Sequence, residues 1–222
     1  MKRRTLLATG GAAVLVGGAF ALNLSHPQNS LLVGMANAQA DGAAADPTAI
    51  ADMVLGSADA TVKITEYASF TCPHCADFHA TAWPKLKADY VDTGKVQFTY
   101  REVYFDRFGL WASMMARCGG EMRFFGIAEM IYDKQRDWTA SGDPATIAQD
   151  LRKLGKTAGL TDDMLDACMN DAETAQNLVA WFEANAKADD ISSTPSFIIN
   201  GTKYSNMSYA DMSKIIDDAI AG

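Results

Sequence analysis

Two cysteines three positions apart are the residues of this chain best suited to chemistry, in the run Cys72-Pro73-His74-Cys75. A disulfide stabilises a fold more as its loop lengthens, so a pair this close contributes little as a structural crosslink. On a helix, the same spacing places the two sulfurs one turn apart. We therefore interpret the pair as a redox-active dithiol that exchanges disulfides with other molecules.

The residues around this pair favour a reactive thiolate at Cys72. A thiol must lose its proton before it attacks or leaves, and free cysteine titrates only near pH ~8.5. A helix that begins at Cys72 would direct its unpaired N–H groups and the positive end of its dipole at the sulfur. Pro73 suits the first helical turn, and His74 can add positive charge. Cys75 is expected to be less exposed and to resolve mixed disulfides formed at Cys72.

An acidic residue accompanies the pair. Glu66 lies on the apolar face of a predicted strand over residues 62–68, and this strand ends shortly before Cys72. Burial would raise the pKa of its carboxyl group, which could then take and return the proton of Cys75. The alternative is that Glu66 only has a polar partner within a partly covered strand.

A metal site is the rival interpretation of the two cysteines. His79 extends the motif to C-x-x-C-x-x-x-H, which offers three ligands for copper or zinc in an envelope protein. Structural zinc usually has four ligands, and the sequence has no second C-x-x-C or histidine pair to supply the fourth. We therefore expect His79 to lie on a helix surface, and we expect no metal and no cofactor.

The N-terminus has the pattern of an export signal. Residues 2–4 are basic, residues 5–24 are uncharged, and small residues at 36–40 form A-x-A cleavage patterns before Asp41, the first acidic residue. We expect residues 1–40 to be a signal peptide cut after residue 40. A retained membrane anchor is the alternative, and the paired arginines would permit the twin-arginine route.

Removal of the signal leaves 182 residues, with 16 Lys and Arg against 27 Asp and Glu and a formal net charge of −11. Such an acidic chain is not expected to bind nucleic acid, because phosphate contacts require basic residues. Four cysteines in an exported chain favour disulfides. The length suits one domain, or one domain with a large insertion.

Periodicity and turn residues predict the order strand, helix, strand, helical block, strand, strand and helix. The expected elements are strands over 62–68 and 96–103, a helix from 72 towards 90 divided at Pro84, a helical region over 106–190, strands over 196–199 and 202–205 joined by Asn200-Gly201, and a last helix capped by Ser208 with Asp211. Outside the helical region, this order predicts a small mixed sheet with helices packed on it.

The run Phe70-Thr71-Cys72-Pro73-His74-Cys75 resembles the DsbA family of periplasmic thiol–disulfide oxidoreductases. Glu66 stands where that family has a buried acid, and Thr194-Pro195 resembles its cis-proline loop. The resemblance implies an α/β fold: a thioredoxin fold in two parts, residues 41–105 and 191–222, with a large all-helical insertion over residues 106–190.

The same resemblance implies a dithiol oxidase that introduces disulfides into newly exported proteins. Thr194 and Pro195 would offer backbone to an extended, reduced substrate. A membrane quinone-linked partner of the DsbB type would reoxidise the pair, and the protein would act as a monomer. An isomerase or reductase of the same fold is the nearest rival. Isomerases of this group usually carry an N-terminal dimerisation module, for which residues 41–60 are too short.

Two features depart from the family pattern. In its best-known members a lysine on the second strand partners the buried acid, whereas here Tyr100 or its neighbours occupy that stretch. The proton path is therefore expected to run through water or Tyr100. Cys118 and Cys168, absent from some members, lie about fifty residues apart in the helical region. We predict a structural disulfide between them, with two separate buried thiols as the alternative.

Overall fold

The computed structural model of this protein describes residues 44–222. The predicted export signal over residues 1–40 and its cleavage site lie outside the described residues. Across residues 44–222, none of the helices combines the length and the apolar character that crossing a bilayer requires.

Five strands form one mixed sheet. They are β1 (Met53–Leu55), β2 (Val62–Ala68), β3 (Val96–Glu102), β4 (Ser196–Ile199) and β5 (Thr202–Ser205). Their spatial order is β1-β3-β2-β4-β5. The central strand β2 pairs in parallel with β3 and antiparallel with β4. Because β2 lies between β3 and β4, it has no exposed edge, and most of its side chains are buried.

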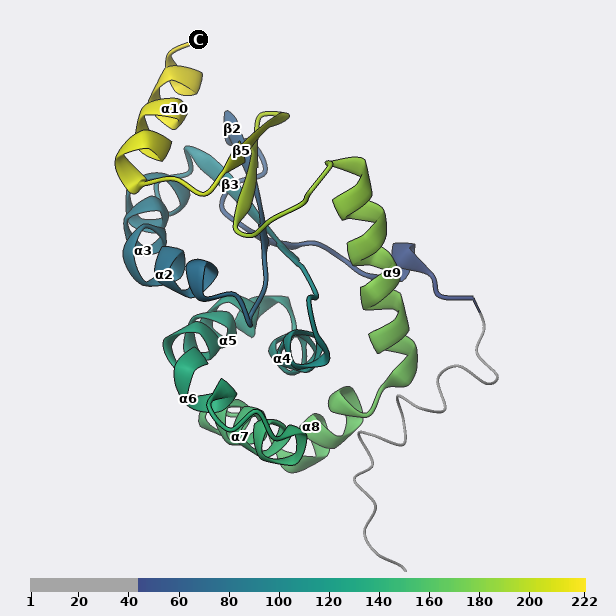
Figure 1. Ribbon diagram of the computed structural model, residues 1–222. Coiled ribbons are helices and arrows are strands. Elements are labelled where there is room, and N and C mark those ends of the chain that lie inside the picture. The colour runs from purple at the N-terminus through teal and green to yellow at the C-terminus, as the bar shows by residue number, and fades with distance from the viewer. Residues whose placement is uncertain (1–43) are drawn as a thin grey trace, which may run out of the picture.

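Helices account for most of the remaining described chain. They are α2 (Pro73–Thr81), α3 (Trp83–Leu86), α4 (Arg107–Arg117), α5 (Glu121–Asp133), α6 (Gln135–Thr139), α7 (Pro144–Thr157), α8 (Asp162–Met169), α9 (Ala172–Ala188) and α10 (Tyr209–Ala221), with a 3-10 turn η1 (Pro47–Ala49) and a π-turn η2 (Lys87–Val91). Helices α2, α3 and α10 lie on one side of the sheet and α9 on the other (Figure 1).

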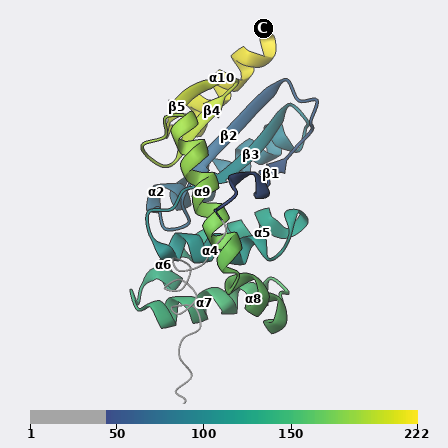
Figure 2. The ribbon, with the colours of Figure 1, turned by 90° about the vertical axis from the view of Figure 1, so that its right-hand side faces the viewer.

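Helices α4 to α8 form a block below the sheet, and α9 runs alongside both (Figure 2). In chain order these helices fall between β3 and β4. One continuous hydrophobic core joins the two parts, because it contains Val62 and Phe98 of the sheet together with Leu151 and Leu165 of the block. The architecture is therefore a thioredoxin-like fold that carries a helical insertion, as the sequence predicts.

The divided helix after Cys72 follows from its proline. Helix α2 ends at Thr81, and α3 begins at Trp83 with Pro84 in its first turn. Proline is tolerated at that position because the first N–H groups of a helix have no helical partner. The strands β2, β4 and β5 and the cap of the last helix by Ser208 match the sequence predictions.

The segment before β2 contains a short helical turn and a strand that the sequence analysis did not predict. Asp46 caps η1 through its side chain, and its backbone N–H donates to Asn177 of α9 at 2.7 Å. The first strand is β1, at residues 53–55, not β2. Three residues are too few to show the alternation that identifies a strand, and only pairing with the edge of β3 defines β1.

Candidate active site

Cys72 stands at the start of α2, which places its sulfur at the positive end of the helix. It is the N-cap residue, with φ −84° and ψ 118°, and Pro73 follows at the first helical position. Cys72 is 8% exposed, whereas Cys75 is fully buried. Both are free thiols, so the structure describes the reduced dithiol. The predicted order of exposure is confirmed.

The surroundings of Cys72 stabilise its thiolate and lower its pKa to about 5. The largest cause is a hydrogen bond from the Cys75 side chain, which outweighs the opposing effect of burial. The Thr194 side chain and the backbone N–H groups of Cys75 and His74 act in the same direction. At neutral pH, Cys72 is therefore a thiolate ready to attack, or a good leaving group.

Cys75 has the opposite character. Burial raises the pKa of its thiol, and the hydrogen bond to Cys72 and the negative charge of Glu66 raise it further. The thiol therefore keeps its proton at neutral pH and needs a base when it must attack. Two cysteines one turn apart thus differ in both exposure and protonation, which separates their roles.

Pro73 and His74 are the exposed residues between the two cysteines. Pro73 begins the helix without leaving an N–H group unpaired. The contact of His74 that stabilises the thiolate is its backbone N–H. The sequence interpretation assigned this effect to the imidazole, whereas the backbone contact comes from the helix geometry itself.

Thr194 and Pro195 lie against Cys72 although 122 residues separate Thr194 from it in the chain. The Cys72 Sγ atom is 3.5 Å from the Thr194 carbonyl oxygen. The Thr194-Pro195 peptide bond is cis, as the family resemblance implies. The turn before β4 therefore forms one wall of the site, beside the N-terminus of α2.

Glu66 and His79 form a buried pair beneath α2. The Glu66 Oε2 and His79 Nε2 atoms are 3.0 Å apart, and the side chains are 0% and 4% exposed. The expectation of a helix-surface position for His79 is therefore wrong: the residue lies on the inward face of α2, four positions after Cys75. The polar partner of Glu66 is a helix residue, and Tyr100 instead shares a hydrogen bond with Tyr132 at 2.6 Å.

Gln135 of α6 is a site residue that the sequence analysis missed. Its Nε2 group donates to the carbonyl oxygens of Phe70 and Cys72, at 2.8 and 2.9 Å, and the residue is buried. The helical block thereby holds the backbone on both sides of Thr71. A lone glutamine in a short helix carries no sequence signal for such a contact, because the partner lies more than sixty residues away.

A second link to the helical block comes from Thr71. Its hydroxyl donates to Asp106 Oδ2 at 2.9 Å, and Asp106 also caps α4 through the N–H groups of Phe108 and Gly109. The loop before Cys72 is therefore fixed from two helices of the block, α4 and α6. Such contacts limit the conformations of the loop and so keep the sulfur of Cys72 in place.

The other two cysteines are bonded to each other within the helical block. Cys118 ends α4, Cys168 lies on α8, and their Cα atoms are 5.8 Å apart. This is the pairing that the sequence analysis predicts. The bond links two helices that lie fifty residues apart in the chain.

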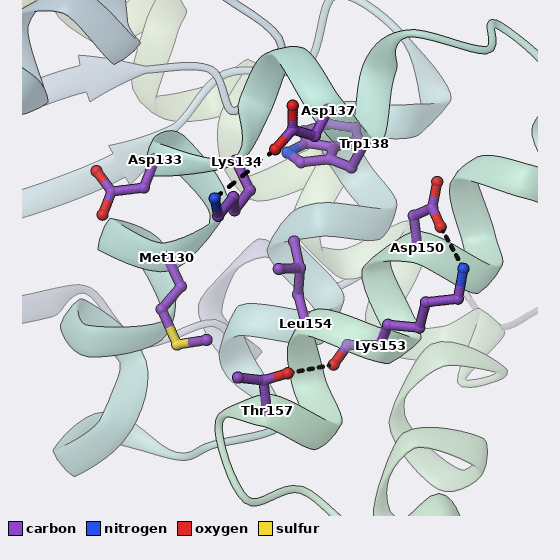
Figure 3. A pocket seen from close by; sticks show the side chains of 9 residues that line it. All are labelled: Met130, Asp133, Lys134, Asp137, Trp138, Asp150, Lys153, Leu154 and Thr157. Carbon is purple, nitrogen blue, oxygen red and sulfur yellow. Dashed lines mark hydrogen bonds and ion pairs between the residues drawn. The ribbon is translucent and has the colours of Figure 1, made fainter.

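Two hollows lie near these elements. One, of about 400 Å³, lies among α5, α6 and α7 and includes Met130, Trp138 and Leu154 in its lining; it contains none of the predicted site residues (Figure 3). The other, of about 270 Å³, runs between the outer side of α2 and residues 206–209. Within residues 44–222, no three His, Cys, Asp or Glu side chains are grouped so as to hold a metal ion.

Comparison with known proteins agrees with this geometry. The sequence model of the thioredoxin family matches residues 48–218. A protein of Rickettsia bellii, named provisionally as a protein-disulfide oxidoreductase, is 38% identical over 170 residues, which are 76% of this chain and 64% of the relative. Disulfide bond formation protein D of Bacillus subtilis is 25% identical over 193 residues, 82% of this chain and 83% of that protein.

Solved structures show the same relationship. Alpha-DsbA1 of Wolbachia pipientis superposes with a TM-score of 0.70 at 25% identity, over 77% of this chain and 91% of that one. The chain spans 61 to 64% of the length of three Rickettsia relatives. The similarity therefore covers the sheet, the helical block and the cysteine pair of this chain, but not the full length of those relatives.

Proposed function

Since this chain belongs to the thioredoxin family, with residues 48–218 matched, we propose that it is a thiol–disulfide oxidoreductase that works as a dithiol oxidase. The observation that carries the proposal is the contrast at the start of α2. There the pKa of Cys72 is lowered to about 5, while burial raises the pKa of Cys75. A thiolate-stabilising site favours the reduced protein, and this makes its disulfide a strong oxidant.

The proposed reaction starts from the Cys72–Cys75 disulfide. A substrate thiolate attacks the Cys72 sulfur, the Cys72–Cys75 bond breaks, and Cys75 leaves with the electron pair and takes up a proton. A second substrate thiolate then attacks the substrate sulfur of the mixed disulfide and expels Cys72 as a thiolate. The substrate has lost two electrons and gained a disulfide, and the protein holds the reduced dithiol.

The low pKa of Cys72 serves the last step, because a stabilised thiolate is a good leaving group. Thr194 and Pro195 supply the wall against which an extended substrate lies. Proline has no N–H group, so at position 195 the backbone offers no donor that would compete for the sulfur. Glu66 is the acidic group that exchanges the proton with Cys75, since its negative charge is close enough to raise the pKa of that thiol.

The proposed substrates are reduced proteins that have been exported to the periplasm, where disulfides persist. A membrane quinone-linked protein of the DsbB type is the proposed reoxidant. The predicted signal peptide and the even number of cysteines support this location. We propose that the protein acts as a monomer and without a cofactor, because the cysteine pair itself carries the two electrons.

A redox equilibrium tests the oxidase assignment against the isomerase and reductase alternatives. The purified chain without residues 1–40 is incubated with defined ratios of reduced and oxidised glutathione, and the fraction of Cys72–Cys75 disulfide is measured after acid quenching. An oxidase should remain reduced until the glutathione mixture is strongly oxidising. An equilibrium typical of a reducing protein such as thioredoxin, near −270 mV, would contradict the proposal.

A turnover assay completes the test. Oxidised protein is mixed with a reduced model substrate, and the rate of substrate disulfide formation is compared with the rate at which the same protein reshuffles a scrambled substrate. The proposal predicts fast oxidation and slow reshuffling. The opposite ratio would identify an isomerase.

A further inference from the structure

His79 is a buried titratable residue close to the cysteines that the proposed reaction leaves without a role. It lies one helical turn after Cys75 on α2, and residues at positions i and i+4 of a helix are neighbours on one face. The ring is closed in by aromatic side chains, with its centroid 4.3 Å from Tyr132, 5.8 Å from Trp83 and 6.0 Å from Tyr100. The pair with Glu66 is therefore sealed beneath the cysteines.

Several elements packed around His79 contribute groups that face its ring. Strand β2 contributes Glu66, β3 contributes Tyr100, α5 contributes Tyr132, and α2 itself contributes Cys75 one turn away. The Trp83 indole faces the ring but donates its own N–H to Glu129. Glu66 is thus the acidic group in direct contact with the ring, and the phenols keep their protons because burial raises the pKa of each.

Each member of the pair retains one polar atom without a partner. Within residues 44–222, no hydrogen bond is made to Glu66 Oε1 or to His79 Nδ1, although both atoms are buried. Buried polar atoms are nearly always satisfied, so an unsatisfied one requires an explanation, of which a catalytic role is one. Here each unpaired atom leaves the pair capacity to bind or release a proton.

On the basis of the proposed function, we propose that His79 is a positioning residue that holds Glu66 as the proton acceptor and donor of Cys75. When a substrate breaks the Cys72–Cys75 bond, the pair donates a proton to the Cys75 thiolate. During reoxidation the pair takes that proton back, so that Cys75 can attack the Cys72 sulfur of the mixed disulfide and expel the thiolate of the oxidant.

The charges explain why a histidine is useful in this position. A carboxyl group buried alone would favour its neutral form. It would therefore ionise, and become able to accept a proton, only at raised pH. A hydrogen-bonded imidazole can share the proton that the pair holds, so that this proton passes to and from Cys75 through Glu66. The pair then changes only from neutral to singly negative as Cys75 changes from thiolate to thiol, so the core never holds two uncompensated negative charges.

The test follows the reaction of the reduced protein with oxidised glutathione by rapid mixing, acid quenching and mass measurement. Cys72 first attacks the glutathione disulfide and forms a mixed disulfide; Cys75 then attacks Cys72 and releases glutathione. The two phases are measured between pH 5 and 9 for the parent and for His79→Gln, which retains a hydrogen-bond donor near Glu66 but cannot become positive in this range.

We expect the second phase of His79→Gln to require a pH about one unit higher, and so to be about tenfold slower at pH 7. The first phase should be unchanged, because it depends on the Cys72 thiolate. Tyr132→Phe is the matched control: it retains the ring stacked on His79, removes a neighbouring buried hydroxyl, and should leave both phases at parental values.

Identical second phases in His79→Gln and the parent would overturn the inference while leaving the proposed function intact. If instead the parent forms no mixed disulfide at Cys72, the proposed function itself fails. A measurement on the parent alone covers the case in which His79→Gln does not fold. The imidazole resonances of His79 should titrate at different pH in the reduced and oxidised forms, and equal titrations would also overturn the inference.

Discussion

The two cysteine pairs of this chain have the same chemical groups and opposite fates. Cys72 and Cys75 lie three residues apart at the start of a helix, and both are free. Cys118 and Cys168 lie fifty residues apart, and they are bonded between two helices of the insertion. What differs is the surroundings: one pair has a stabilised thiolate beside the Thr194-Pro195 turn, while the other closes a long loop. Position, not residue type, decides whether a cysteine pair reacts or crosslinks.

Removal of either cysteine should distinguish the two pairs most strongly. Cys72→Ser should abolish oxidation of a reduced model protein, because the remaining thiol of the pair, Cys75, is fully buried and keeps its proton. Cys75→Ser should retain Cys72 reactivity but accumulate mixed disulfides with the substrate, which mass mapping can locate. A linkage through any residue other than Cys72 would show that the nucleophile is wrongly assigned.

Removal of the crosslink should affect stability and leave the reaction intact. The double variant Cys118→Ala/Cys168→Ala should lose about 2 to 4 kcal/mol of unfolding free energy, because the unfolded chain gains the freedom of a fifty-residue loop. Chemical denaturation measures the loss, and turnover at a temperature where both proteins are folded should stay within about twofold. A large loss of turnover in the folded variant would mean that this disulfide takes part in the reaction.

The Cys72–Cys75 pair should also make the stability of the reduced protein depend on pH. A depressed pKa in the folded reduced protein gives stability that is complete above the pKa of the free thiol and is lost as pH falls through about 5. Relative to the oxidised protein, the reduced form should therefore gain roughly 2 to 3 kcal/mol between pH 5 and pH 7. Denaturation of both forms at each pH checks this, and a constant difference would contradict it.

A smaller effect is expected from Gln135, which connects the helical block to the reactive pair. Gln135→Leu removes both hydrogen bonds to the Phe70 and Cys72 carbonyls, and should cost about 1 to 3 kcal/mol of stability because those carbonyls stay buried. Turnover should fall by about threefold, as the loop before Cys72 loses one of its two anchors. Gln135→Glu is the paired comparison, since it retains the length but not the donor.

Much of this arrangement could be predicted from local sequence. Alternation identified β2, the Asn200-Gly201 turn identified the last hairpin, and Ser208 marked the final helix. The reactive pair and the contrast between its cysteines follow from spacing and helix geometry. Local patterns of this kind involve residues that are neighbours along the chain, and a single sequence displays them directly.

The rest depends on contacts between distant segments. His79 was expected on a surface because one histidine on a short helix gives no sign of which face is buried, and Glu66 lies thirteen residues away on another element. Gln135 and β1 were missed for the same reason: each is defined by a partner far along the chain. The sequence therefore predicts the position and the order of exposure of Cys72 and Cys75 better than it predicts the residues that hold them.

The measurement that tests the central claim most directly is a titration of the reduced protein by thiolate absorbance near 240 nm. Cys75→Ser and Cys72→Ser variants, measured in parallel, assign the signal to one sulfur. We expect the parent to show one thiolate with a midpoint near pH 5, which Cys72→Ser lacks, and no second thiolate up to pH 9. A midpoint near ~8.5, the value of free cysteine, would contradict the assignment of this pair as the oxidising centre.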